Sequence, residues 1–182
     1  MVITFVLFGR FMSSTAHALQ DSGKLLDIDT EKLFTNTPDV LNASLYFWET
    51  TFYPMIADAQ IMAPGFMHFR DMFQPYEKYV NEQTRALDYL RSLSNHIDFM
   101  CYLNWCYKQN GFCSRLQLAD IMVKPMQRLT KYSLLLRRLI NHTDIEPERT
   151  SLKAMVMPIT KTLRVILEQK ISTQLELLNF DL

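Results

Sequence analysis

Residues 116–143 read LQLADIMVKPMQRLTKYSLLLRRLINHT, a segment in which apolar and basic side chains recur at helical intervals. Apolar positions lie three and four residues apart, so one stripe of a long helix can be buried while the cations face solvent. We expect Pro125 to bend this helix, at a cost of roughly 3 kcal/mol if the site were otherwise an ideal helix interior. The apolar stripe consists of Ile121, Met126, Leu129, Tyr132, Leu135, Leu136, Leu139 and Ile140.

A polar ridge follows the other side of the same helix. Between residues 121 and 143 there is no acidic side chain, so the cations there can form a local positive patch. The ridge measures about 16 Å from end to end at the helical rise per residue. It is either a solvated face, with Asp120 and Lys124 in an i,i+4 ion pair worth roughly a few tenths of a kcal/mol, or a surface that binds a partner. The ridge consists of Asp120, Lys124, Gln127, Arg128 and Lys131.

The composition bounds the class of protein. The chain has 182 residues, of which 48% are hydrophobic and 21% charged, and this balance fits one folded domain. The formal net charge is zero, so the field of the whole molecule does not drive binding to nucleic acid or to acidic membranes. The chain has only four glycines and long stretches of helical periodicity, which predict an all-α fold.

Helical patterns precede and follow the central stretch. We expect a helix to begin at Thr37, which can cap it, with Pro38 in its first turn. An aromatic stripe follows, and its width indicates a core face rather than a cofactor site. We expect a break near residues 94–95, and we expect Pro158 to interrupt the last helical pattern. The aromatic stripe consists of Phe66, Phe69, Phe73, Tyr76 and Val80.

Cysteine and histidine spacings argue against metal and covalent chemistry. The three cysteines, Cys101, Cys106 and Cys113, lack the paired spacing of a zinc site, and we expect free thiols in a reducing compartment. The four histidines show no ligand spacing, and no serine lies in a GxSxG elbow. We therefore predict no catalytic residue, no metal site and no cofactor.

The first 20 residues, MVITFVLFGRFMSSTAHALQ, begin with a short apolar run. The run is similar to a signal-peptide core with a cleavage site after Ala18, but no cation precedes it and Arg10 follows it at once. It is also too short to span a bilayer, which needs about 20 apolar residues. We expect a helix start or an unstructured lead-in of a cytoplasmic protein without a transmembrane segment. A secreted helical protein is the alternative.

The central stretch closely resembles the most diagnostic segment of Dbl-homology domains, the catalytic modules of guanine-nucleotide exchange factors for Rho-family GTPases. The resemblance rests on KPMQR at residues 124–128, on Lys131 with Tyr132, and on the leucine run at 134–136. LLDIDTEKLFTNTPDVL at residues 25–41 and FRDMFQPYEKYVNEQTRALDYL at 69–90 are similar to two further segments of the family. The resemblance extends over about residues 25–156. It is strongest to the pleckstrin-homology-domain-containing family G exchange factors.

The resemblance implies an elongated helical bundle whose long helix docks on the switch regions of a GTPase. It carries a partner-contacting role onto Asp120, Gln127 and Lys131, and we extend the GTPase-binding face over the whole ridge, to Lys124 and Arg128. A lysine there can hold backbone carbonyls or a carboxylate of the second switch as a compact cation. Such a factor stabilises the nucleotide-free GTPase and so weakens nucleotide binding by linkage.

Both ends of the chain depart from the family pattern. The family's first helix carries a glutamate that engages the first switch, whereas residues 1–20 contain no acidic side chain. The family's last helix carries an Asn or Asp toward its end, whereas MPITKTLRVILEQK at residues 157–170 has no matching motif. We therefore expect a bundle incomplete at both ends. Residues 1–20 would be an atypical lead-in, 21–157 a partial Dbl-homology domain lacking the first conserved helix, and 158–182 a divergent C-terminal helix or tail.

The expected function is that of an exchange module for a Rho-family small GTPase, weak or inactive as it stands. Losing one buried charged contact, worth about 2 to 5 kcal/mol, would slow exchange by roughly 30-fold to several thousand-fold. The alternative is a non-catalytic helical module that docks on a GTPase or another partner without promoting exchange. We expect no nucleic-acid partner and no pleckstrin-homology domain in this chain.

Overall fold

The computed structural model describes residues 2–54, 66, 68–109 and 116–180. In this part of the chain every regular element is a helix, which confirms the predicted all-α fold. The elements are α1 (Val2–Asp21), α2 (Thr30–Phe34), α3 (Thr37–Phe47), the π-helical turn η1 (Trp48–Phe52), α6 (Phe69–Met72), α7 (Pro75–Ser92), the 3₁₀ turn η3 (Leu93–Asn95), α8 (Ile97–Gln109), α9 (Leu118–Met122), α10 (Lys124–Asn141) and α11 (Glu146–Phe180).

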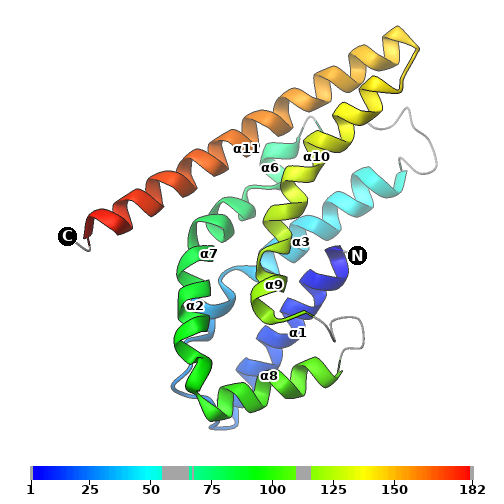
Figure 1. Ribbon diagram of the computed structural model, residues 1–182. Coiled ribbons are helices and arrows are strands. Elements are labelled where there is room, and N and C mark those ends of the chain that lie inside the picture. Colours follow the sequence, from blue (N-terminus) through cyan, green and yellow to red (C-terminus); the bar gives the residue numbers. More distant parts are fainter. Residues whose placement is uncertain (1, 55–65, 67, 110–115, 181–182) are drawn as a thin grey trace.

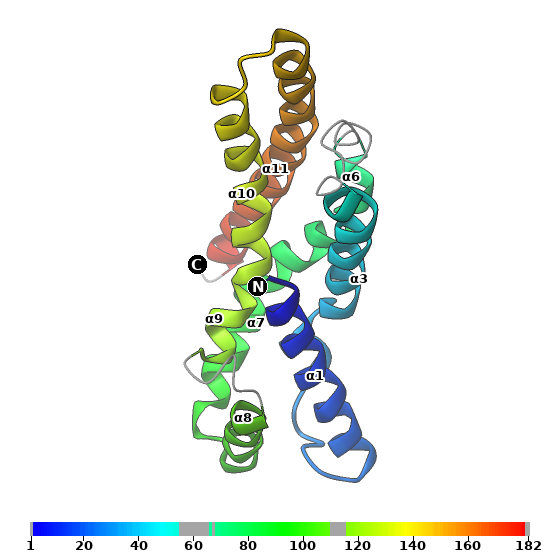
Figure 2. The same cartoon turned by 90° about the vertical axis from the view of Figure 1, so that its right-hand side faces the viewer.

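The helices form an elongated bundle. Helices α10 and α11 run antiparallel and extend together beyond the rest of the molecule, while α1 and α8 form the opposite end (Figure 1). The quarter-turned view shows the same long outline, with α7, α9 and α10 between the two ends (Figure 2). The expected elongated helical bundle is therefore observed.

The bundle has two hydrophobic cores, one above the other in Figure 1. The lower core lies between α1, α2, the C-terminal half of α7, α8 and α9, and it includes Met12, Leu33, Ala86, Phe99 and Leu118. The upper core lies between α3, α6, the N-terminal half of α7, α10 and α11, and it includes Phe47, Phe69, Val80, Leu129 and Ile159. Helix α7 contributes side chains to both.

An aromatic cluster forms the centre of the upper core. The ring of Phe47 lies 4.9 Å from that of Phe73 and 5.2 Å from that of Tyr132, both in edge-to-face geometry. Phe69 stacks on Phe73 with centroids 4.2 Å apart. Such pairs add to the free energy gained from burying apolar area. All five members of the predicted aromatic stripe are buried, so the interpretation as core is confirmed.

The start of α3 differs in detail from the prediction. Asn36, rather than Thr37, occupies the N-cap position, and Asn36 makes no side-chain capping bond. Thr37 is the first helical residue, and its hydroxyl donates back to the carbonyl oxygen of Phe34. Pro38 lies in the first turn as predicted, where its missing amide leaves no intrahelical bond unmade.

The first residues of the chain form a regular helix. Helix α1 extends through Asp21, and Met12 and Ala16 are buried in the lower core. The sequence left open a helix start or an unstructured lead-in for this segment, and the structure shows a helix. No helix in the described ranges is long and apolar enough to cross a membrane.

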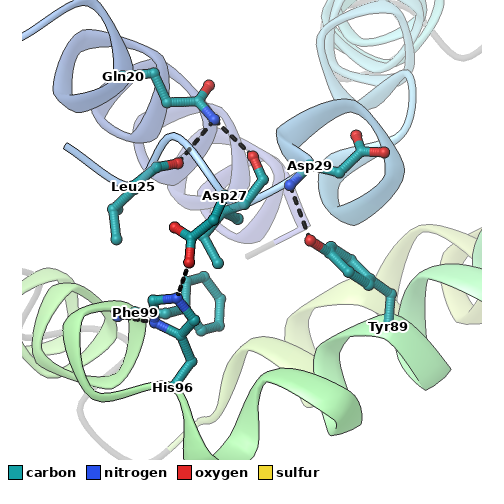
Figure 3. Close-up of polar contacts among 8 residues, drawn as sticks. Gln20, Leu25, Asp27, Asp29, Tyr89, His96 and Phe99 are labelled. Carbon is teal, nitrogen blue, oxygen red and sulfur yellow. Dashed lines mark hydrogen bonds and ion pairs between the residues drawn. The ribbon is translucent and has the colours of Figure 1, made fainter. Parts of the chain in front are cut away.

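The loop between α1 and α2 is fixed by polar contacts from α1 and α7 (Figure 3). Nε2 of Gln20 donates to the carbonyl oxygens of Leu25, at 3.1 Å, and Ile28, at 2.6 Å. The amide of Asp29 donates to the hydroxyl of Tyr89 on α7 at 2.8 Å. Leu25 is buried with φ +54°, a conformation that L-residues seldom adopt, and these bonds hold it there.

Helix α11 runs without interruption from Glu146 to Phe180, so the prediction that Pro158 interrupts the helical pattern is wrong. Pro158 offers no amide to the carbonyl of Ala154, but Ala154 is exposed and water can replace that bond. The helix continues because buried side chains on both sides of the proline pack on the upper core. They are Leu152, Met155, Ile159, Leu163 and Ile166.

Candidate functional site

The first part of the ridge is the short helix α9, whose N-terminus is closed by its own side chains. The side chain of Gln117, at the N-cap, accepts the amide of Asp120, and Oδ2 of Asp120 accepts the amide of Gln117 at 3.0 Å. This capping box satisfies two helix-end amides and orients the carboxylate. Asp120 is exposed, so its other oxygen remains available to a partner.

A break separates α9 from α10, and it corrects the prediction of one continuous helix. Val123 is the cap residue between the two helices, and Pro125 lies in the first turn of α10 rather than at a bend inside a longer helix. In a first turn the missing amide of proline costs no intrahelical bond. The carbonyl of Met122, the last residue of α9, instead accepts the hydroxyl of Tyr79 and Nε2 of Gln83, each at 2.8 Å.

Gln127 and Lys131 are the exposed members of the ridge on α10. They lie four residues apart, on adjacent turns of one face. The structure gives neither side chain a hydrogen bond or an ion pair with another described residue. An amide that can both donate and accept therefore lies beside a solvated ammonium group, which is a pair suited to backbone and carboxylate groups of a partner.

Arg128 turns toward the aromatic cluster instead of projecting freely from the ridge. Its guanidinium carbon lies 4.9 Å from the ring centroid of Tyr132 and 5.8 Å from that of Phe52. Arg128 is half-buried, as is Lys124 at the start of the helix. Burial raises the pKa of Tyr132, and the neighbouring Arg128 acts in the opposite direction. The ridge thus has an exposed part, Asp120 with Gln127 and Lys131, and a half-buried part, Lys124 with Arg128.

The predicted apolar stripe of α10 is only partly core. Leu135 and Leu139 are 42% and 44% exposed, and Leu134 is 58% exposed. Consecutive helix residues are about 100° apart, so a run of three leucines cannot face one core. The exposed leucines lie just beyond Lys131 and extend the face that α10 offers to solvent. Three consecutive leucines at residues 134–136 are the feature of the sequence from which this exposed apolar surface could have been predicted. The buried members of the stripe are Ile121, Leu129, Tyr132 and Leu136.

The cavity beside α8 lies apart from the ridge. An open cavity of about 990 Å³ lies between α1, the following loop and α8, and its walls include Leu25, Cys101 and Trp105 but no ridge residue. Among the described residues, no group of three or more His, Cys, Asp or Glu side chains is placed to hold a metal ion. Cys101 is an exposed thiol and Cys106 a buried one, whereas Cys113 lies outside the described ranges.

The elongated bundle is a helical module of the Dbl-homology type. The chain belongs to the RhoGEF domain family, whose sequence profile matches residues 3–166. The match extends on both sides of the range 21–157 that the sequence analysis assigned to the domain, and it includes most of α1.

Curated relatives support the same assignment. Pleckstrin homology domain-containing family G member 5 of Rattus norvegicus is 33% identical over 153 residues, which is 79% of this chain and 15% of the relative. Member 6 of the same group from Mus musculus is 31% identical over 160 residues, or 81% of this chain and 20% of the relative. The chain therefore spans only a small part of the length of these relatives.

Solved structures share the fold. The apo structure of the activated truncation of Vav1 has a TM-score of 0.81 at 22% identity, covering 94% of this chain and 43% of that one. The DH/PH domain of human ARHGEF11, in a ternary complex with human RhoA and its inhibitor, has a TM-score of 0.76 at 18% identity, covering 95% and 51%. Both show that the bundle is the architecture of known exchange-factor domains.

Proposed function

We propose that this chain is the exchange module of a guanine-nucleotide exchange factor and that it docks on a Rho-family small GTPase. The observation that carries the proposal is the exposed pair Gln127 and Lys131, whose side chains make no hydrogen bond or ion pair with another described residue and which lie on a helix whose start is fixed by packing. Membership of the RhoGEF family supports the class of partner.

The proposed mechanism involves no bond chemistry. Docking of Asp120, Gln127 and Lys131 on the switch regions favours the nucleotide-free GTPase, and any difference in affinity between its two states weakens nucleotide binding by the same factor. Lys124 and Arg128 support this surface from half-buried positions. The module is thus a regulator that accelerates exchange. We place it in the cytoplasm, where the thiols of Cys101 and Cys106 would stay reduced.

A second candidate is a docking module that binds the GTPase without promoting exchange. The observation that favours it is the absence of an acidic residue in α1 before Asp21, its last residue, since the family uses a carboxylate on its first helix. Helix α1 contacts α9 and α10, so a carboxylate there would have been near the ridge.

Release of fluorescent GDP from a panel of Rho-family GTPases tests both candidates. We expect the chain to raise release above the intrinsic rate, and Lys131→Ala or Gln127→Ala to reduce that effect at least about tenfold. Arg137→Ala is the matched control, because Arg137 lies on the same helix and lines the groove toward α11. Binding without release would favour the second candidate. A chain that binds none of the GTPases would overturn both.

A further inference from the structure

A chain of hydrogen bonds links α11, α7 and the break between α9 and α10. Nζ of Lys170 on α11 donates to Oε1 of Gln83 at 3.0 Å. Nε2 of Gln83 donates to the carbonyl oxygen of Met122 at 2.8 Å, and the hydroxyl of Tyr79 donates to the same oxygen at 2.8 Å. Gln83 and Tyr79 are only 5% and 4% exposed, so water cannot substitute for these partners.

In this series of hydrogen bonds, the order of donors and acceptors fixes the role of each residue. An ammonium group only donates and a carbonyl only accepts, so the link between them must accept at one end and donate at the other. Gln83 does both, and Lys170 fixes which way its amide faces. Burial raises the pKa of Tyr79, which therefore stays protonated and donates. Burial lowers the pKa of Lys170, as expected for an ammonium drawn partly out of water.

The break that these bonds hold divides the exposed ridge. Asp120 lies on α9 before it, whereas Gln127 and Lys131 lie on α10 after it. The amide of Gln127 donates to the carbonyl of Val123, the N-cap residue of α10, at 3.1 Å, so this bond belongs to the start of α10. The bonds that α7 makes to the Met122 carbonyl fix the end of α9 beside it.

We propose that Gln83 and Lys170 are positioning residues that set the angle between α9 and α10, so that Asp120 and Lys131 contact the GTPase at the same time. This inference rests on the proposed function. Helix α11 would thus control, through Lys170, the docking surface on α9 and α10, although α11 forms no part of that surface.

The test measures GDP release by the full chain as a function of its concentration, for the wild type and for Lys170→Met. We expect Lys170→Met to lower kcat/KM roughly tenfold or more, since small misplacements of contacting groups have effects of that order. Lys170→Arg keeps a donor and should restore most of the activity. Lys161→Met removes an exposed lysine of the same helix and should leave GDP release unchanged.

Hydrogen exchange of backbone amides gives a second measurement. Exchange at Gln127 should be faster in Lys170→Met than in the wild type, while exchange at Phe99 in α8 should be the same in both.

A second variant and a double-mutant cycle separate positioning from general destabilisation. Gln83→Glu keeps the acceptor for Lys170 but loses the donor to Met122, so it should reproduce the loss. Asp120→Asn removes the charge while an oxygen can still cap α9. In that background Lys170→Met should have less than about a twofold further effect, because coupled residues are not additive. A full, additive effect would overturn the proposal. If the wild type accelerates GDP release and Lys170→Met accelerates it equally, this inference is wrong and the proposed function stands. If the wild type docks on no GTPase, both are wrong.

Discussion

At the scale of single residues, Arg128 and Lys131 lie within one turn of α10 and use their charges differently. The guanidinium of Arg128 lies over the rings of Tyr132 and Phe52, whereas the ammonium of Lys131 is solvated. Spacing along one helix was enough to place both residues on one ridge. It could not show that Phe52, from a distant turn, would cover part of that ridge, because the contact depends on tertiary packing.

We predict that Arg128→Lys destabilises the fold although it keeps the charge. Arginine is planar and stacks on aromatic faces, whereas lysine is a compact, strongly hydrated cation. The free energy of unfolding should fall by about 0.5 to 2 kcal/mol, as judged from urea denaturation. Lys131→Arg, on the solvated side of the same helix, is the control and should leave the urea midpoint unchanged. Equal stability of Arg128→Lys and the wild type would show that the ring contacts contribute nothing.

His96, directly before α8, contacts Asp27 in the loop that follows α1 (Figure 3). Nε2 of His96 lies 2.6 Å from Oδ2 of Asp27, and Nδ1 accepts the amide of Phe99 at 3.2 Å, which caps α8. The hydrogen bond with Asp27 raises the pKa of His96, with Asp98 acting in the same direction, and lowers the pKa of Asp27. Protonation at Nδ1 would strengthen the pair but remove the cap.

The pair should therefore stabilise the fold in a defined pH window. A raised pKa means that the His96 contribution is fully present below the ordinary pKa of 6.5 and is lost as pH rises through the pKa in the folded chain. The Asp27 contribution is present above 3.8 and is lost as pH falls through its lowered pKa. The difference in Tm between the wild type and Asp27→Asn should be largest between these limits, and it should shrink both as pH rises through the pKa of His96 and as pH falls through the pKa of Asp27. The same pH dependence in both chains would contradict the assignment.

At the scale of helices, the periodicity of the sequence predicts most of the helices, but it does not predict where they are interrupted. The aromatic stripe from Phe66 to Val80 was predictable because its spacing leaves one buried face. Pro125 and Pro158 were harder, because a proline either starts a helix or interrupts one, and neighbouring contacts decide which. At Pro125 the break between α9 and α10 is stabilised by side chains of α7, which bond to the carbonyl of Met122. Those side chains are distant in sequence, so no local pattern reveals them.

Helix α11 accommodates Pro158 because packing outweighs the local cost. A proline in a helix interior costs about 3 kcal/mol, whereas each fully buried large aliphatic side chain contributes about 1.5 to 3 kcal/mol. Five such side chains on the two sides of Pro158 pack on the upper core, so their sum exceeds the cost. The rule that a proline interrupts a helix fails here, because it takes no account of packing against neighbouring helices.

Pro158→Ala should therefore stabilise the chain. Alanine restores the amide that the carbonyl of Ala154 lacks, and we expect the free energy of unfolding to rise by about 1 to 3 kcal/mol. Thermal unfolding followed by circular dichroism measures the change. Thr160→Ala, at an exposed position one half-turn further on, is the control for helix propensity alone. A decrease in Tm for Pro158→Ala would mean that the proline fits a bend that the packing requires.

At the scale of the whole molecule, the chain has two cores but one connected framework. Helix α7 places Tyr76 and Val80 in the upper core and Ala86 in the lower one, with Gln83 between them bonded to Met122. The sequence predicted a single domain from length and composition, and it could not show that the core is divided. The two cores lie one after the other along the elongated bundle (Figure 1).

This framework predicts that damage to one core lowers the stability of the other. Phe47 lies at the centre of the upper aromatic cluster, and Phe47→Ala should cost about 3 to 5 kcal/mol. Each core has one tryptophan beside it: Trp48 stacks on Phe52 near the upper core, and Trp105 stacks on Phe11 near the lower one. The chain contains only these two tryptophans, so Trp48→Phe and Trp105→Phe give chains with a single fluorescent reporter for each core.

Urea unfolding of the two single-tryptophan chains should give coincident transitions, and Phe47→Ala should shift both midpoints equally. The reason is that α7 cannot leave the upper core without removing Ala86 and its neighbours from the lower one, so the two cores unfold together as in a two-state transition. Cys106→Ser, a small change in the lower core, makes the reciprocal test, and it should lower both midpoints by a similar, smaller amount. If Phe47→Ala shifts the Trp48 transition and leaves that of Trp105 in place, the cores are independent units. In that case Gln83 and Met122 would link two separately folding halves, with α9 in the lower core and α10 in the upper one.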